Sequence, residues 1–178
     1  MKAWPRVHEV LEAVGLGLDL SRARRADVEQ GLIRGAAVHV LVEADFYGYP
    51  ADVAPEYAPY LDAWRKFRAE SGYDPQVIEY EVRHRAWQYV GHPDSWGWLN
   101  GHRCIPDFKT GTTEGVAYQV AAYVLAHNDM HPTEPVTVGA VLELHDNGRY
   151  KFSEIDLPAA TQVWLAALVV FRAQKGHT

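Results

Sequence analysis

Cysteine is almost missing from this 178-residue chain, which contains a single one, Cys104. A lone cysteine cannot form an internal disulfide or a thiolate metal cluster. Long apolar runs are missing as well, since no stretch approaches the roughly 20 residues that a membrane span needs. The opening MKAWPRVHEV lacks the apolar centre of a signal peptide. These absences argue against secreted and membrane classes, and we expect a cytoplasmic protein of a bacterium or of a phage-infected host cell.

An excess of positive charge is also lacking. Lys and Arg total 17 against 23 Asp and Glu, a formal net charge of −6, which argues against a generally basic surface for nucleic acid. Carboxylates that hold metal ions are neutralised by them, so a metal-dependent enzyme is compatible with this balance. Any basic surface must then be local. Its candidate residues form two groups, Arg22, Arg24, Arg25 and Arg34, and Arg65, Lys66 and Arg68. The alternative is that each lies on a solvated helix face.

The apolar content, 48% with 22% charged residues, is that of an ordinary globular protein. The length favours one domain over residues 1–178. Helical spacing of apolar side chains predicts helices over 6–14, 22–46 and 58–71. The Pro-, Gly- and Tyr-rich segment 47–57 predicts a loop. We therefore expect a mainly helical part over 1–75 and a sheet core with a C-terminal helix over 76–178.

The period of the pattern changes in the second part. Alternating apolar residues predict a strand over 77–84, and two more over 87–99 and 102–109, joined by the hairpin turn Asn100-Gly101. Helical spacing returns after the second hairpin arm. The remaining expected elements are a helix over 114–128, a hairpin over 136–144 and 149–155, and a helix over 157–174. This order predicts a mixed α/β sandwich rather than a doubly wound sheet.

The Asn100-Gly101 turn permits a geometric prediction. Counting outward from a two-residue turn, Asp94 and Asp107 lie directly opposite each other, with Cβ atoms roughly 4.5–5.5 Å apart. Lys109 follows two residues later on the same strand and therefore points to the same face. The three side chains should form one cluster.

Two opposed carboxylates destabilise a hairpin unless something neutralises them. A hard divalent cation such as Mg²⁺ or Mn²⁺ would do so. Pro106 cannot donate to the ladder, so the strands should open there and leave room for a metal. The alternative is that Asp94 and Asp107 lie in separate loops and that Lys109 pairs with one of them. For the acids, the lysine and the proline together, we favour the metal site.

At this point four short motifs resemble one family. IPDFKTG (105–111) is similar to the signature of the PD-(D/E)XK nuclease superfamily, and GHPD (91–94) to the G-x-x-D that precedes it in RecB-like members. YQVAAY (118–123) resembles the Q-x-x-x-Y helix of that branch, and RGAAVHVLVE (34–43) its upstream helix. The resemblance is to the RecB-like and Cas4-like exonuclease branch, in small phage-type form, and covers nearly the whole chain.

The resemblance implies a restriction-endonuclease-like α/β/α sandwich, with a central mixed sheet and an N-terminal helical extension. It also implies DNA hydrolysis that depends on one or two Mg²⁺ or Mn²⁺ ions. The residues that it makes metal ligands are His39, Asp94, Asp107 and the backbone carbonyl of Phe108. Asp107 replaces the Glu that many relatives carry. The iron–sulfur cluster of Cas4-like relatives needs four cysteines and is excluded.

The same resemblance assigns other roles. Lys109 would orient or activate the attacking water, and Asp94, Asp107 and Lys109 would form the catalytic set. Gln119 and Tyr123 would lie near the substrate end of the site; the alternative is a solvated Gln119 and a Tyr123 in the core.

Three further residues have open alternatives. Arg34 either contacts a phosphate or caps a helix. Glu43 shares a helix face with His39, which either binds metal or hydrogen-bonds its neighbour. Glu81 is expected to assist the site, whereas an exposed strand face is the better interpretation of Glu79.

The favoured function is a metal-dependent DNA exonuclease of a recombination or repair type, which acts on linear or single-stranded ends. A structure-specific endonuclease is the rival within nucleases. A catalytically silent DNA-binding module on the same fold, and an unrelated hydrolase of small phosphates, are rivals from other classes. A homo-oligomer is compatible with the sequence.

Overall fold

The computed structural model describes residues 4–17 and 24–176. Five helices and seven strands are present in these ranges. In chain order they are α1 (Val7–Ala13), α2 (Arg25–Tyr47), α3 (Ala58–Ser71), β1 (Asp74–Ile78), β2 (Val82–His84), β3 (Tyr89–Gly91), β4 (Ser95–Leu99), β5 (His102–Lys109), α4 (Val116–Met130), β6 (Val138–Leu144), β7 (Tyr150–Glu154) and α5 (Leu157–Gln174).

Five of the strands form one mixed sheet, in the order β1-β4-β5-β6-β7. Neighbouring strands in this sheet run antiparallel, except for β5 and β6. These two run parallel, and helix α4 connects them. Strands β2 and β3 form a separate two-stranded sheet. The predicted α/β fold with a central mixed sheet is confirmed.

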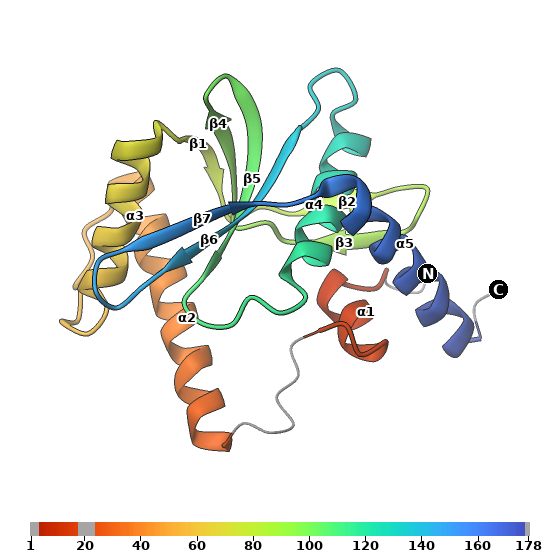
Figure 1. Cartoon of the computed structure of the whole chain (residues 1–178), viewed down its shortest axis with the longest axis horizontal. Helices are drawn as coiled ribbons and strands as arrows, with labels where there is room; N and C mark the ends of the chain where they lie inside the picture. The colour runs from red at the N-terminus through yellow and green to blue at the C-terminus, as the bar shows by residue number, and fades with distance from the viewer. Residues whose placement is uncertain (1–3, 18–23, 177–178) are drawn as a thin grey trace.

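Helices cover both faces of the large sheet (Figure 1). Along β5, Ile105 packs with α1, α4 and α5, whereas Cys104 and Phe108 pack with α2 and α3. This alternation follows from the two-residue period of a strand, which sends successive side chains to opposite faces. The sheet therefore separates two apolar cores. β5 is buried on both faces and lies at the centre of the molecule.

The predicted strand 77–84 is wrong as a single element. Its first residues belong to β1 and its last to β2, in different sheets. The chain turns between them at Glu79, whose φ of 54° lies in the left-handed region. The alternation of Ile78, Tyr80 and Val82 carried no sign of this turn, because a single left-handed residue leaves the sequence pattern unchanged.

The predicted strand 87–99 is also two strands, β3 and β4, with GHPD at the junction. The Asn100-Gly101 turn is confirmed: φ is 50° and 81° at the two residues, as a type I′ turn requires. Near this turn the register is the expected one, with Leu99 opposite His102 and Gly97 opposite Cys104.

The other helices lie close to their predicted ranges. Helix α3 begins and ends at the expected residues, and so does α5, whose start is capped by the Asp156 side chain accepting a hydrogen bond from the Ala159 N–H at 3.1 Å. For α2, residues 22 and 23 of the expected range lie outside the described residues. Among the described helices, none has the length and apolar content to cross a membrane.

Candidate active site

The antiparallel pairing of β4 and β5 ends three residues short of Asp94. Asp94 instead directs its carboxylate at β5, where Oδ2 accepts a hydrogen bond from the Phe108 N–H at 2.5 Å. A side chain thus occupies the place of a strand partner. Asp94 and Asp107 are 6% and 1% exposed. The expected opening of the ladder before Pro106 is therefore present, and two acids lie buried beside it.

Lys109 forms an ion pair with Asp107 through its ammonium group. The lysine side chain is 24% exposed, so it reaches solvent at one edge of the cluster. Burial alone would lower the pKa of Lys109, but Asp107 and Asp94 outweigh it and raise the pKa above its usual value. Lys109 is a fixed positive charge at neutral pH.

Helix α2 contributes His39 from the other side of the strand end. Its Nε2 lies 3.3 Å from the carbonyl oxygen of Phe108, and its Nδ1 lies 3.4 Å from Asp94 Oδ1 and 3.1 Å from Glu79 Oε1. Burial would lower the pKa of His39, but Asp94 and Glu79 outweigh it and raise the pKa to about 9. The imidazole therefore faces three oxygen atoms from three segments of the chain.

Glu79 is the residue that the sequence reasoning missed. Its left-handed backbone lets its N–H donate to the carbonyl oxygen of Asp94 at 2.8 Å, and its side chain turns toward His39. The strand alternation placed Glu79 on the same face as Glu81, but the backbone bends at Glu79, and Glu81 pairs with Arg83 and His92 instead. A non-glycine residue with positive φ at a cluster of charges indicates local strain that the surrounding contacts stabilise.

The acids of this cluster oppose one another. Burial and the neighbouring Asp107 raise the pKa of Asp94 to about 7, despite the opposing effects of His39 and Lys109. An ionised carboxylate that is buried beside another acid needs a cation to neutralise it. The three acids Asp94, Asp107 and Glu79 outnumber the two cations beside them, Lys109 and His39, and a bound metal ion would neutralise the excess negative charge.

The donor set fits a divalent metal. Ligand atoms of His39, Glu79 and Asp94 all lie within 4.8 Å of one another. The resemblance adds Asp107 and the Phe108 carbonyl to these ligands. Asp107 lies beside Asp94, and the Phe108 carbonyl lies beside His39. Carboxylate and carbonyl oxygens with one imidazole nitrogen are all groups that bind divalent metal ions in proteins.

Helix α4 holds the opposite side of Asp107. The Gln119 amide donates one hydrogen bond to Asp107 Oδ1 at 3.1 Å and another to the Tyr123 hydroxyl at 2.8 Å. Tyr123 is 5% exposed, and burial with Asp107 and Asp94 nearby raises its pKa well above the usual value. Gln119 is therefore not the solvated side chain of the alternative interpretation: it orients a carboxylate of the site.

Two residues that the sequence grouped with the site do not contact it. Glu81 pairs with Arg83 at 2.6 Å and with His92 at 3.3 Å. Glu43 lies one turn after His39 on α2, but makes no hydrogen bond or ion pair with any described residue. Arg34 lies beside the site: its Nε donates to the Thr110 hydroxyl at 3.4 Å.

Most of the basic candidates have local acidic partners. Arg24 pairs with Asp27, and Arg65 and Arg68 both pair with Asp45. Lys66 lies 3.9 Å from Glu70. Arg22 lies outside the described residues. For Arg24, Arg65 and Lys66, whose side chains are at least half exposed, the solvated helix face is the better description, whereas the Arg68 guanidinium lies over the Trp64 ring.

No known family profile matches this sequence, and no curated protein is similar to it by sequence. Among solved structures, SSO0001 superposes with a TM-score of 0.34 and 11% identity, over 62% of this chain. The chain spans 56% of the length of SSO0001.

An alkaline exonuclease from Laribacter hongkongensis, LHK-Exo, gives a TM-score of 0.44 and 12% identity over 96% of this chain and 91% of its own. The same enzyme in complex with dAMP gives 0.43 and 14%, over 96% and 87%. With TM-scores below 0.5, none of these structures identifies the family of this chain.

Proposed function

We propose that this protein is a metal-dependent nuclease that hydrolyses DNA phosphodiester bonds from a strand end. One observation carries the proposal: the buried acids Asp94 and Asp107 meet at one strand end, with the ammonium of Lys109 and the imidazole of His39 beside them. Phosphodiester hydrolysis needs a nucleophilic water and neutralisation of the charge that develops on phosphate. This cluster offers groups for both.

Asp94, Asp107, His39 and the Phe108 carbonyl would hold Mg²⁺ or Mn²⁺, with Glu79 as an additional ligand. A divalent metal at such a site supplies a bound water of lowered pKa and a Lewis acid for the phosphate oxygens. Lys109 donates to the attacking water or to the phosphate from the solvent edge of the cluster. Gln119 holds Asp107 in a fixed orientation through a hydrogen bond, which keeps the ligand geometry rigid.

The substrate assignment rests on the four motifs that resemble RecB-like nucleases. Their residues, far apart in sequence, lie together: His39 comes from the upstream helix, Asp94 and Asp107 from the strand motifs, and Gln119 from α4. A protein that uses Mg²⁺ or Mn²⁺ in the cytoplasm of a bacterium or of a phage-infected cell would suit the role of a recombination or repair exonuclease. Oligomerisation would be compatible with this role.

The experiment is hydrolysis of DNA labelled at one end, in linear and in covalently closed circular form, with Mg²⁺, Mn²⁺ or EDTA. We expect stepwise shortening of the linear DNA with metal and none with EDTA. The Asp107→Asn variant should be inactive with a native circular dichroism spectrum. Cleavage of the circle would favour the structure-specific endonuclease instead. Binding without cleavage in every metal would favour the catalytically silent module.

A further inference from the structure

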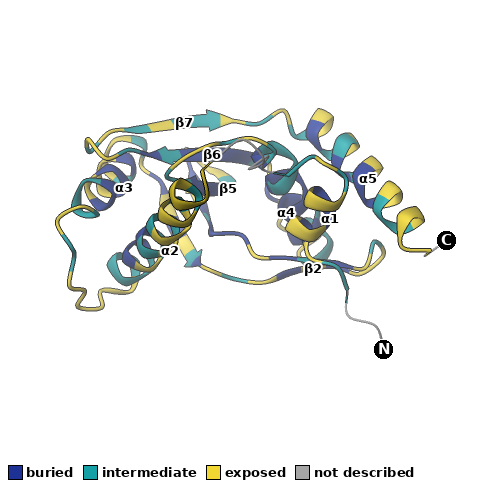
Figure 2. Cartoon of the chain, turned by 90° about the horizontal axis from the view of Figure 1, so that it is seen from below, coloured by how far each residue is buried: buried dark blue, intermediate teal, exposed yellow. Residues whose placement is uncertain are grey.

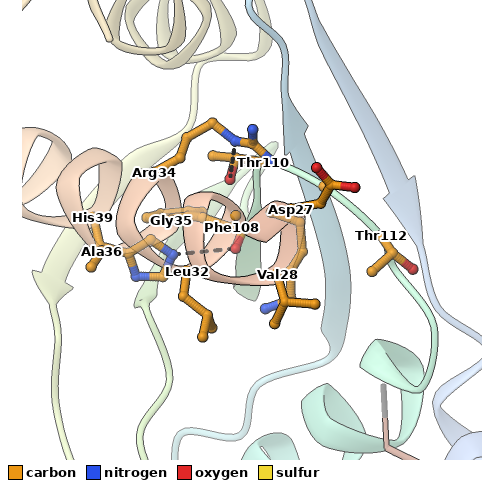
Figure 3. Close-up of a pocket in the computed structure, with 13 residues that line it drawn as sticks. Asp27, Val28, Leu32, Arg34, Gly35, Ala36, His39, Phe108, Thr110 and Thr112 are labelled. Carbon is orange, nitrogen blue, oxygen red and sulfur yellow. Dashed lines mark hydrogen bonds between the residues drawn. The ribbon is translucent and has the colours of Figure 1, made fainter. Parts of the chain in front are cut away.

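A pocket of about 400 Å³ adjoins the candidate active site (Figure 3). One wall is α2, and the other is the segment from Phe108 to Thr112 that leaves β5. His39, Phe108 and Lys109 line the pocket and also contact the buried acids Asp94 and Asp107. A group bound in this pocket would therefore lie next to any phosphate bound at Lys109.

The pocket has an apolar interior and a polar rim. Val28, Leu32 and Ala36 of α2 face it with aliphatic groups. Arg34 bonds to Thr110, and Lys109 marks the end next to the acids. The carboxylate of Asp27, which also lines the pocket, is paired with Arg24. Such a site suits a ligand with a flat apolar part attached to an anionic part.

Two glycines of α2, Gly31 and Gly35, make this wall flat. Glycine inside a helix costs roughly 0.5–1 kcal/mol relative to alanine. Packing does not require either one, because an added Cβ would come no closer than 3.9 Å to Arg34 at Gly31 and to Thr110 at Gly35. Both line the pocket. The glycines widen the pocket on the side where a planar ring would lie against the helix.

We infer that this pocket receives one unpaired nucleobase, from a nucleotide directly adjoining the phosphodiester bond that is cut. The inference rests on the proposed function and names its substrate class, a strand whose terminal or flanking nucleotide is single-stranded. A paired base is stacked within a duplex and cannot enter a pocket between a helix and a loop unless it is extruded. Aliphatic walls bind the face of any base, so the pocket predicts little preference for sequence.

Arg34 has a place in this binding mode. Its guanidinium lies over two glycines, since a Cβ on Gly31 or Gly111 would be 3.9 Å or 3.7 Å from Nη2. Only its Nε is bonded to a described side chain, that of Thr110. The remaining donors can reach the phosphate on the outer side of the bound nucleotide, and the planar guanidinium can stack on its base.

The test uses single-stranded oligonucleotides of one sequence, with an abasic tetrahydrofuran residue on either side of the mapped cleavage position. We expect the wild-type protein to cut about tenfold more slowly when the residue on one particular side is abasic, since stacking of one base is worth roughly 1–3 kcal/mol. Ala36→Trp fills the pocket from an exposed helix position. It should slow cleavage of the normal strand to within about twofold of the abasic one.

Ile33→Trp is the matched control, because Ile33 is an exposed residue of the same helix, 49% accessible, that does not line the pocket. Thermal unfolding verifies that both variants fold. The inference is overturned if abasic residues on both sides leave the wild-type rate unchanged, or if Ile33→Trp loses as much activity as Ala36→Trp.

A binding measurement separates this inference from the proposed function. Fluorescence anisotropy of the same oligonucleotides is measured with Ca²⁺. If no DNA is cut with Mg²⁺ or Mn²⁺, but the normal strand binds about tenfold tighter than the abasic one and Ala36→Trp removes the difference, hydrolysis is refuted and the base pocket stands. Cleavage without any preference between the two strands, in binding or in rate, refutes the pocket alone.

Discussion

The two hairpins of the large sheet differ in their turns and in how far their strands pair. The β6–β7 hairpin pairs from Leu144 opposite Tyr150 to Ala140 opposite Glu154. The β4–β5 hairpin pairs only from Leu99 opposite His102 to Gly97 opposite Cys104. Beyond this point the backbone partner of β5 is replaced by the Asp94 carboxylate. Backbone pairing thus begins at the turn in both hairpins. In the β4–β5 hairpin, which we call the open hairpin, charged side chains lie where backbone pairs would otherwise continue; β6–β7 is the closed hairpin.

The difference also shows in the charges of the two hairpins. In the closed hairpin, Lys151 pairs with Glu143 at 2.8 Å across the strands, and the Lys151 side chain is 65% exposed. In the open hairpin, Lys109 pairs with the almost fully buried Asp107. An exposed pair contributes little to stability, whereas a buried cluster holds its groups in place at a cost in stability. The open hairpin is therefore the one that carries the candidate reactive groups. The following experiments test this contrast.

The largest effect is expected for the two lysines. Lys109→Ala should lower kcat for DNA hydrolysis by about 100- to 1,000-fold, because it removes the charge that faces the phosphate in the transition state. Lys151→Ala, the matched change in the closed hairpin, should leave kcat within about twofold. Steady-state rates on end-labelled DNA measure both. Equal losses in the two variants would remove the functional distinction between the hairpins.

The next effect concerns Asp94 in the metal-free protein. Its pKa of about 7 exceeds the value of about 4 expected in the unfolded chain, so its contribution to stability is fully present below pH 4 and lost as the pH rises through 7. Asp94→Asn should therefore be more stable than wild type at pH 8 in EDTA, by about 1–3 kcal/mol. Its neutral amide oxygen still accepts the Phe108 hydrogen bond.

Urea unfolding at pH 8, with and without Mn²⁺, measures this effect. Mn²⁺ should raise the free energy of unfolding of wild type and not that of Asp94→Asn, because the variant lacks a ligand charge. At pH 4 the two proteins should differ little in EDTA. An Asp94→Asn variant that is less stable than wild type in EDTA at pH 8 would contradict the charge imbalance.

The two turns provide a smaller and more specific comparison. Gly101 and Gly148 have φ values of 81° and 72°, so alanine at either position should cost about 1–2 kcal/mol. Only Gly101→Ala should also lower activity, because three residue pairs connect its turn to Asp94. Urea unfolding gives the stability and kcat/KM at 20 °C gives the activity. A Gly148→Ala variant with the same loss of activity would show that the hairpins do not act separately.

The smallest effect is the exposed pair itself. A double-mutant cycle of Glu143→Ala and Lys151→Ala should give a coupling energy of about 0.2–1 kcal/mol that decreases with added salt. Urea unfolding of the four proteins at low and high ionic strength measures it. A coupling above about 2 kcal/mol would mean that the closed hairpin also depends on charge.

Local signals were sufficient for many elements. The type I′ turn at Asn100-Gly101 set the register near the tip of β4–β5, and the apolar stripe with its early proline set α5. The predicted strand boundaries are wrong where a single residue changes the backbone conformation. At Glu79 a left-handed conformation divides the chain between two sheets, and alternation along a strand cannot report such a change.

The site was predicted unevenly for a related reason. Counting along the hairpin grouped Asp94, Asp107 and Lys109, but the direct cross-strand pairing that it predicted for the two acids is wrong, because the β4–β5 ladder ends at Gly97. The proximity of His39 to Phe108, which lies 69 positions later, came only from the motif resemblance, and Glu79 was set aside altogether. Glu43 and Glu81 shared a helix or strand face with site residues in the pattern, yet a shared face does not determine which neighbour packs against it.

The sequence by itself determined the Asn100-Gly101 turn and most of the helices, and it grouped Asp94 with Asp107, because each depends on residues that are close along the chain. Only the tertiary structure decided which groups complete the cluster. Helix α2 packs on one face of the sheet and α4 on the other, and this packing delivers His39 and Gln119 to opposite sides of the same strand end. Figure 2 shows the burial that accompanies it, with much of β5 and β6 buried and much of α2 exposed. Contacts between distant segments follow from the burial of two apolar cores, which no local pattern contains.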